Sequence, residues 1–163
     1  MVSINIKPID NSYSKRAIDL ILKIQKEEFN TAITIEDQPD LFEIENYYLK
    51  KGGNFWGAFI NDELVGTIAL AKFENSSGAV RKMFVKEQFR GKELGIAQCL
   101  LNELISYSIL NDITNLYLGT ITVFKAAQHF YERNNFTQIG KEELPRLFPL
   151  MNADNVFYHL NIQ

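Results

Sequence analysis

The chain has 163 residues, of which 46% are apolar and 12% aromatic, a composition typical of a globular protein with one full core. The net charge of −3 and the lack of a basic block argue against nucleic acid as a partner. No apolar run approaches the roughly 20 residues that span a bilayer, and MVSINIKPID at residues 1–10 lacks the pattern of a secretory signal. We therefore expect a cytoplasmic protein with no membrane partner and a single domain over residues 1–163.

The first part of the chain predicts a strand, two helices and three antiparallel strands. Apolar and polar residues alternate over residues 4–9, and Pro8 favours a strand at a sheet edge because proline lacks a backbone donor. Ser14 is a candidate N-cap for a helix that runs to about Phe29. The elements expected next are a helix over about residues 40–49 ended by Gly52 and Gly53, a hairpin of residues 55–60 and 64–73, and a strand over residues 79–85.

The second part predicts alternating helices and strands. A polar turn leads from the strand ending at Val85 into a helix that continues through Leu104, and residues 116–120 predict a parallel strand. The elements expected after it are a helix over about residues 124–133, a strand near residues 137–142, a loop over residues 144–155 and a strand over residues 156–162. This order indicates the α/β (α+β) class, with one mixed, mostly antiparallel central sheet and helices on both faces.

The junction between Val85 and the following helix has the features of an anion site. The first turn of a helix leaves backbone N–H groups without intrahelical partners and carries partial positive charge, so a phosphate is stabilised there. Gly91 lets the backbone approach a ligand, and Arg90 and Lys92 add positive charge at the rim. An ordinary strand-to-helix connection with a glycine at the bend is the alternative that this stretch alone leaves open.

Two segments resemble the signature segments of the GNAT superfamily of N-acetyltransferases. They are the strand and turn ending in RGKELG at residues 90–95 and the helix AAQHFYERNNF at residues 126–136. The turn of that family is usually Arg or Gln, two residues, Gly, one residue, then Gly or Ala. Arg90 and Gly95 fill the outer positions, whereas Glu93 stands where the inner glycine is expected. Its carboxylate has to point away from a bound pyrophosphate or weaken its binding.

The resemblance implies an acetyl-CoA-dependent N-acetyltransferase that moves an acetyl group to a primary amine of a small molecule or peptide by direct attack. The pantetheine arm is expected to lie like an added strand along the main chains of Met83, Phe84 and Val85. The residues implied at the pyrophosphate are Arg90, Gly91, Lys92, Glu93, Leu94, Gly95 and Ile96, mainly through their backbone amides. No metal is expected, because the two histidines and Cys99 lack metal-ligand spacing.

Tyr131 is the candidate catalytic residue. In the family, a tyrosine at this place often lies near the CoA sulfur and acts as the general acid, and a phenol with an ordinary pKa of about 10 stays protonated at neutral pH. Packing against Phe130 and Phe136 is the structural alternative. Phe124 occupies a CoA-contacting position at which many members carry asparagine. Asn135 replaces a common glycine at the helix end, where asparagine tolerates the left-handed conformation.

The sequence does not assign a general base. Many members carry a glutamate at the position nearest to Ala79, so the resemblance supplies no general base there. Glu36, Asp37, Glu74 and His129 are open candidates, each with the alternative of a solvated surface group. A water chain to solvent, or an amine that is already partly neutral, would also serve.

The acceptor amine is expected to bind between residues 36–41 and residues 144–149. The residues considered there are Phe148, Tyr47, Tyr48 and Trp56 as an apolar wall and Asp37 or Asp154 as a contact for a cation. Dimers are frequent among such enzymes, so a homodimer is one option for the oligomeric state. Cys99 is expected to be packed or partly packed within its helix rather than nucleophilic.

Two interpretations from other classes remain beside the enzyme. The departures at Glu93, Phe124 and Ala79 fit a non-catalytic acyl-CoA-binding sensor or regulatory module that binds acetyl-CoA without turnover. A dinucleotide-binding protein needs a three-glycine spacing that residues 90–95 lack. The N-acetyltransferase is the interpretation that we carry forward.

Overall fold

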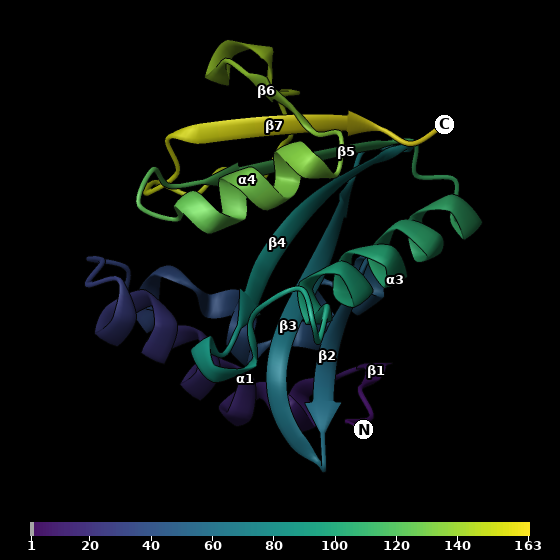
Figure 1. The fold of residues 1–163 in the computed structure, drawn as a ribbon. Helices are drawn as coiled ribbons and strands as arrows, with labels where there is room; N and C mark the ends of the chain where they lie inside the picture. The colour runs from purple at the N-terminus through teal and green to yellow at the C-terminus, as the bar shows by residue number, and fades with distance from the viewer. Residues whose placement is uncertain (1) are drawn as a thin grey trace.

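A computed structural model describes residues 2–163, whose strands form one seven-stranded sheet (Figure 1). The strands are β1 (Asn5–Pro8), β2 (Asn54–Ile60), β3 (Glu63–Phe73), β4 (Ser77–Val85), β5 (Asn115–Thr120), β6 (Thr137–Ile139) and β7 (Val156–Asn161). Their order in the sheet is β1-β2-β3-β4-β5-β7-β6, with β1 at an edge as Pro8 predicts. Neighbouring strands are antiparallel except β4 and β5, which are parallel.

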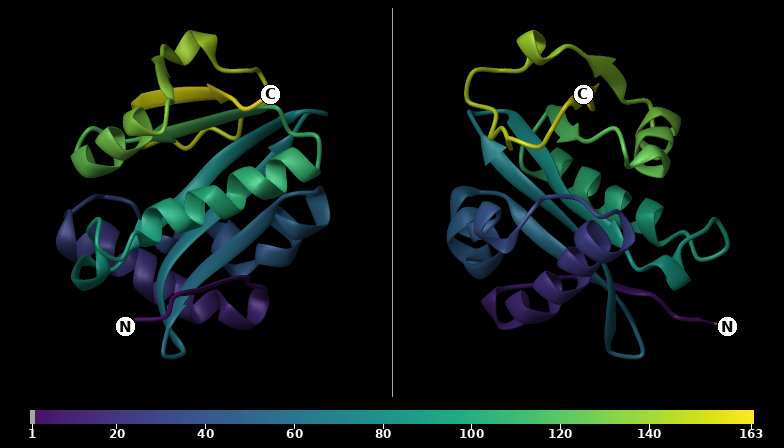
Figure 2. Two further views of the ribbon diagram at one scale, coloured as in Figure 1. Left: turned by 45° about the vertical axis from the view of Figure 1, so that its right-hand side comes forward. Right: turned by 90° about the vertical axis from the view of Figure 1, so that its left-hand side faces the viewer.

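Helices cover both faces of the sheet (Figure 2). On one face lie α1 (Ser14–Leu22), which continues as a π-helix over Lys23–Glu28, and the short α2 (Ile44–Tyr47). On the other face lie α3 (Ile96–Leu110) and α4 (Lys125–Arg133). Short 3₁₀ turns occupy Asn11–Tyr13, Ile35–Asp37, Pro39–Phe42, Leu49–Lys51, Glu87–Phe89 and Lys141–Glu143. The predicted mixed sheet with helices on both faces is confirmed.

Each face of the sheet has its own hydrophobic core. Strand side chains alternate between faces, so Phe55 of β2 packs toward α1 whereas Trp56 packs toward α3. Trp56 is only 1% exposed and meets Tyr107 edge to face, with ring centroids 5.4 Å apart. The prediction that Trp56 forms part of an acceptor wall is therefore wrong, because its ring is enclosed in the core.

Several predicted boundaries differ from the structure. Ser14 does not cap α1; Asp10 caps the preceding 3₁₀ turn instead, where its carboxylate accepts from the Ser12 amide at 2.9 Å. The helix predicted over residues 40–49 is broken into three short turns. Tertiary contacts override helix propensity here, because Tyr48 is fully buried and its hydroxyl donates to the Asp40 carboxylate at 2.5 Å. The strand predicted near residues 137–142 ends at Ile139.

Other local predictions concern backbone conformation and exposure. Gly52 ends the second helical segment with φ +91°, and Asn135 follows α4 with φ +71°, the left-handed conformation predicted for it. Cys99 is exposed on α3, contrary to the packed thiol that the sequence suggested, because it lies on the solvent side of a helix whose Leu100 and Leu101 face the core.

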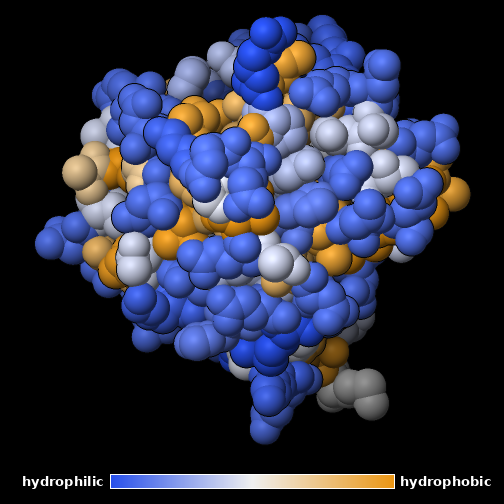
Figure 3. Space-filling model, turned by 90° about the horizontal axis from the view of Figure 1, so that it is seen from above, coloured by the Kyte–Doolittle hydropathy of each residue, from blue (hydrophilic) through white to orange (hydrophobic). Residues whose placement is uncertain are grey.

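The surface is mostly hydrophilic in the view from above, with apolar residues gathered in separate patches (Figure 3). The exposed large apolar side chains include Leu110 of α3 and Leu147 and Leu150 of the loop before β7. Within residues 2–163, no helix has the length and apolar character needed to cross a membrane.

Candidate functional site

A cavity opens where β4 and β5 diverge. The two strands pair only over Ser77–Ala79 and Asn115–Tyr117, and beyond these residues they separate (Figure 1). The edge of β4 that faces β5 therefore has no strand partner over residues 80–85. The cavity, of about 700 Å³, is bordered by both strands, the start of α3 and one side of α4. We call it the first cavity.

A β-bulge in β4 shapes the wall of the first cavity. Thr67 of β3 pairs with Phe84, but Ala69 pairs with Arg81, so that two residues of β4 lie opposite one residue of β3. Lys82 at the bulge has φ +56°. All six consecutive residues 80–85 of β4, Arg81 and Lys82 among them, border the first cavity, because the unpaired edge of the strand forms its wall.

The end of β4 leads into the turn that the sequence singled out. Met83, Phe84 and Val85 border the first cavity, as expected for the strand that would receive a ligand. The carbonyl of Val85 already accepts a hydrogen bond from Arg90 Nε at 2.7 Å, so this one main-chain acceptor is occupied by the protein itself.

Residues 91–95 form an open loop before α3 begins at Ile96. Gly91 has φ +119° and Gly95 has φ +62°, conformations that favour glycine. Within the described chain, the amides of residues 91–94 donate to no other backbone group. Of these, the amides of Gly91 and Lys92 belong to residues that border the first cavity, and with the free amides of the first turn of α3 they make a concentration of backbone donors at one end of it.

The sequence predicts that Arg90 and Lys92 both add positive charge at the rim of this loop, but the structure treats the two side chains differently. The guanidinium of Arg90 makes two hydrogen bonds to the carboxylate of Glu28, at 2.5 and 2.8 Å, which partly neutralises its charge. Lys92 borders the first cavity and is exposed. Glu93 and Leu94, which the resemblance implies at the pyrophosphate, do not border it.

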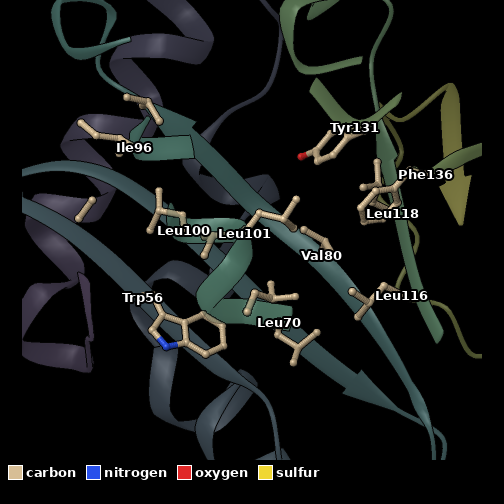
Figure 4. Packing of buried hydrophobic residues seen from close by; sticks show 14 of the residues in the cluster. Trp56, Leu70, Val80, Ile96, Leu100, Leu101, Leu116, Leu118, Tyr131 and Phe136 are labelled. Carbon is tan, nitrogen blue, oxygen red and sulfur yellow. The ribbon is translucent and has the colours of Figure 1, made fainter. Parts of the chain in front are cut away.

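Tyr131 reaches the first cavity from α4. It is 5% exposed and packs against Phe130, Phe136 and Tyr158. Figure 4 shows its hydroxyl directed away from Phe136 and Leu118, and that hydroxyl makes no hydrogen bond to the described residues. Burial, followed by the negative charge of Asp154, raises the pKa of Tyr131 well above its ordinary value, which keeps the phenol protonated. The predicted packing and access to the cavity thus occur together.

Phe124 precedes α4 and also borders the first cavity. Its ring meets Phe29 and Phe84 edge to face, with centroid distances of 4.8 and 6.1 Å. It contributes an apolar wall rather than a polar contact.

A buried polar cluster holds the bulge in place. Gln25 and Gln38 exchange side-chain hydrogen bonds at 3.2 and 2.8 Å, and Lys82 Nζ donates to Gln38 Oε1 at 2.7 Å. Lys82 also lies 3.6 Å from the carboxylate of Asp40. Burial lowers the pKa of Lys82 to about 8, with Arg81 acting in the same direction and Asp40 opposing it. These residues come from three distant segments of the chain, so no local sequence spacing predicts the cluster.

Arg81 is the cation that sequence reasoning missed. It borders the first cavity and a second cavity of about 890 Å³, which lies beside residues 29–33 and 149–153. Within residues 2–163, its guanidinium has no ion pair and no hydrogen bond, although the Tyr48 ring lies 6.0 Å away. A largely buried, always charged group without a partner is a natural receptor for a carboxylate.

The predicted acceptor residues are only partly brought together. Phe148 and Asp154 border the first cavity, and Tyr47 and Asp37 border the second. Tyr48 borders neither, because its ring is enclosed in the core on the α1 side, so its place in an apolar acceptor wall was wrong.

Most of the candidate bases lie outside both cavities. Glu36, Glu74 and His129 are exposed and border neither cavity, and Asp37 is engaged by the Thr34 amide at 3.0 Å. In the described part of the chain, no three His, Cys, Asp or Glu side chains gather as a metal site would require.

Comparisons with known proteins agree with this geometry. Residues 51–138 match the family described as "Acetyltransferase (GNAT) domain". The crystal structure of an acetyltransferase of the GNAT family from Staphylococcus aureus MU50 superposes with a TM-score of 0.95 at 43% identity, covering 99% of this chain and 100% of that one. The chain belongs to the GNAT acetyltransferase family, and the expected class of enzyme is confirmed.

Particular relatives carry more specific names. N-acetylaspartate synthetase from Danio rerio is 37% identical over 106 residues, which are 64% of this chain and 37% of that protein. The Homo sapiens protein of the same name is 32% identical over 126 residues, 74% of this chain and 41% of the relative. The chain thus spans about two fifths of the length of these curated relatives.

A structure of lower identity shows the shared fold. The PaiA N-acetyltransferase from Thermoplasma acidophilum, solved in complex with coenzyme A, superposes with a TM-score of 0.75 at 18% identity, and the match covers 98% of this chain and 99% of that one.

Proposed function

We propose that this protein transfers the acetyl group of acetyl-CoA to the primary amine of a small amino acid that carries a further carboxylate, with aspartate as the first candidate. The observation that carries the proposal is the first cavity itself. It joins an unpaired strand edge, a loop of free backbone amides and the Tyr131 hydroxyl in one space.

The donor side fits the group that the family uses. The amides of Gly91, Lys92 and the first turn of α3 would hold the pyrophosphate, and the free edge of β4 at Met83 and Phe84 would hold the pantetheine arm. Acetyl-CoA supplies an activated acetyl thioester. Because Val85 already accepts from Arg90, we expect fewer than the full set of main-chain contacts at this end of the strand.

The acceptor side favours an anionic substrate. Arg81 offers an unpaired guanidinium at the junction of the two cavities, where it would bind a carboxylate through two parallel hydrogen bonds. The curated relatives named N-acetylaspartate synthetase point to the same chemistry. The sequence predicts that Asp37 or Asp154 contacts a cationic substrate. This proposal replaces that contact by one between Arg81 and a substrate carboxylate.

Tyr131 would act as the general acid. Its hydroxyl faces the first cavity and stays protonated at neutral pH, so it is able to give a proton to the departing thiolate. The apolar rings of Phe124 and Phe130 exclude water from this part of the cavity.

A calorimetric titration with acetyl-CoA, followed by a free-thiol assay with individual amines, tests the proposal. The panel pairs aspartate with asparagine and glutamate with glutamine, and adds spermidine as a cationic amine. We expect acetyl-CoA binding and thiol release that is fastest with the acidic member of a pair. Binding without release for any amine would favour a sensor, and release with spermidine alone would contradict the carboxylate site.

A further inference from the structure

We propose that Asp154, which faces the first cavity from the segment just before β7, is the general base that takes the proton from the attacking amine. This inference rests on the proposed function, because it assigns a role within that reaction. The sequence had considered Asp154 only as a contact for a cation.

The residues that border the first cavity distinguish Asp154 as the candidate base. Among the described residues that border the first cavity, Asp154 is the only aspartate or glutamate, and no histidine borders it. The remaining ionisable groups there are cations and the Tyr131 phenol. Asp40 borders only the second cavity and is engaged by Tyr48 and Lys82. Asp154 makes no ion pair within residues 2–163.

The carboxylate of Asp154 is held over the end of β5. If Gly119 carried a Cβ, that atom would lie 2.5 Å from Asp154 Oδ2 and 2.9 Å from Cγ. The main chain of Asp154 is fixed as well, since its amide donates to the Met151 carbonyl at 3.1 Å. The absence of a side chain at residue 119 thus creates the space in which the carboxylate sits, at the wall of the first cavity.

The surroundings make Asp154 a stronger base than an ordinary aspartate. Burial raises its pKa to about 6, although the positive charges of Arg81 and Lys82 act in the opposite direction. The charged and titratable groups that face it are Arg81, Lys82 and Tyr131. A substrate carboxylate bound to Arg81 would offset part of the positive charge near Asp154 and strengthen the base further. Binding of the substrate would therefore make Asp154 more basic.

The reaction balances with these two groups. The amine lone pair forms a bond to the acetyl carbon, Asp154 Oδ takes a proton from the nitrogen, and the carbon–sulfur bond breaks with its electron pair leaving on sulfur. Tyr131 gives its proton to that sulfur, and the proton on Asp154 then restores the phenol. The products are the N-acetylated amine and the free thiol, and no other reactant is needed.

The test compares the wild-type protein with Asp154→Asn and with Glu103→Gln, a matched exchange of carboxylate for amide on the exposed side of α3. Thiol release is measured across pH with aspartate and acetyl-CoA, and acetyl-CoA binding is titrated in parallel. For the wild type we expect kcat/KM to fall below an apparent pKa near 6. Asp154→Asn should lower kcat by about a hundredfold or more and lose this acidic limb, while acetyl-CoA affinity and Glu103→Gln activity stay within about twofold of wild type.

Each result decides one question. Amine-independent or absent thiol release in the wild type overturns the proposed function and the base with it. Wild-type turnover together with an Asp154→Asn protein that keeps its kcat, or keeps the same acidic limb, overturns the base alone. A second variant, Asp154→Glu, guards against a merely structural effect: it should retain a titrating limb, displaced in pH, which an effect on packing alone would not produce.

Discussion

The carboxylate of Asp154 occupies the space that a side chain at Gly119 would take, with Oδ2 2.5 Å from the position of a Cβ there. The backbone of Gly119 is not in the left-handed region, so alanine is tolerated by the main chain, and the nearest atoms that its Cβ would displace belong to the Asp154 side chain. The two residues therefore form a matched pair, in which one positions the other.

The Gly119→Ala variant tests this relationship. Displacing a reacting group by about 1 Å costs up to about a hundredfold, so we expect kcat to fall by at least about tenfold with acetyl-CoA affinity unchanged. In the Asp154→Asn background the same exchange should have almost no further effect on kcat, because the group that it displaces is already disabled. Additive losses in the double variant would contradict the pairing.

Tyr131→Phe tests the general acid. Removing only the hydroxyl should lower kcat by about a hundredfold or more and leave acetyl-CoA affinity within about twofold, since the ring keeps its packing. Tyr117→Phe is the control, because Tyr117 lies outside both cavities. Unchanged turnover in Tyr131→Phe would remove this residue from the mechanism, whereas equal losses in both variants would indicate a general effect on folding.

Arg81→Gln tests the carboxylate site. A hydrogen bond to a charged group contributes about 1.5–3 kcal/mol, so KM for aspartate should rise at least about tenfold while KM for acetyl-CoA stays the same. Selectivity for aspartate over asparagine should shrink as well. The exposed Arg146 borders neither cavity, so Arg146→Gln should have no such effect. A KM for aspartate that Arg81→Gln leaves unchanged would place the carboxylate elsewhere.

Asp154→Asn should stabilise the folded protein at neutral pH even as it loses activity. The folded-state pKa of about 6 lies above the ordinary 3.8, so the folded state binds the proton more tightly, and stability falls as pH rises from about 4 to about 6. Two pKa units correspond to about 3 kcal/mol as an upper limit, and we expect a gain of the order of 1 kcal/mol for the variant. Urea unfolding at about pH 7.5 and about pH 4 measures it: the gain should be present at the higher pH and absent at the lower. A variant that is less stable at the higher pH would show that Asp154 has a stabilising partner.

The loop before α3 offers a test of the donor side. Gly91 has φ +119°, so Gly91→Ala is strained although the space around it is open, and acetyl-CoA binding should weaken at least about fivefold as the loop re-forms. Glu93→Gln should change affinity by less than about twofold, because Glu93 does not border the first cavity. Calorimetric titration decides between these outcomes. Markedly tighter binding in Glu93→Gln would mean that its carboxylate faces the phosphates after all.

Periodicity and turn residues predict much of the fold of this protein from the sequence alone. Residue alternation predicts the three antiparallel strands, and the left-handed Gly52 and Asn135 follow from residue type. The turn at residues 90–95 and the segment containing Tyr131 were visible because their chemistry depends on local order: a loop of amides and a helix position are encoded by neighbours in the chain.

The acceptor side was decided only by the tertiary structure. Arg81 and Lys82 border the first cavity because β4 loses its pairing with β5 after Ala79, and Asp154 becomes a candidate base because it packs against Gly119 of another strand. Trp56 and Tyr48 were misplaced for the same reason, since the face on which an aromatic ring lies depends on sheet register and on the helix that covers it. Burial and long-range pairing set the charge and pKa of these groups, and neither quantity is contained in the order of residues along the chain.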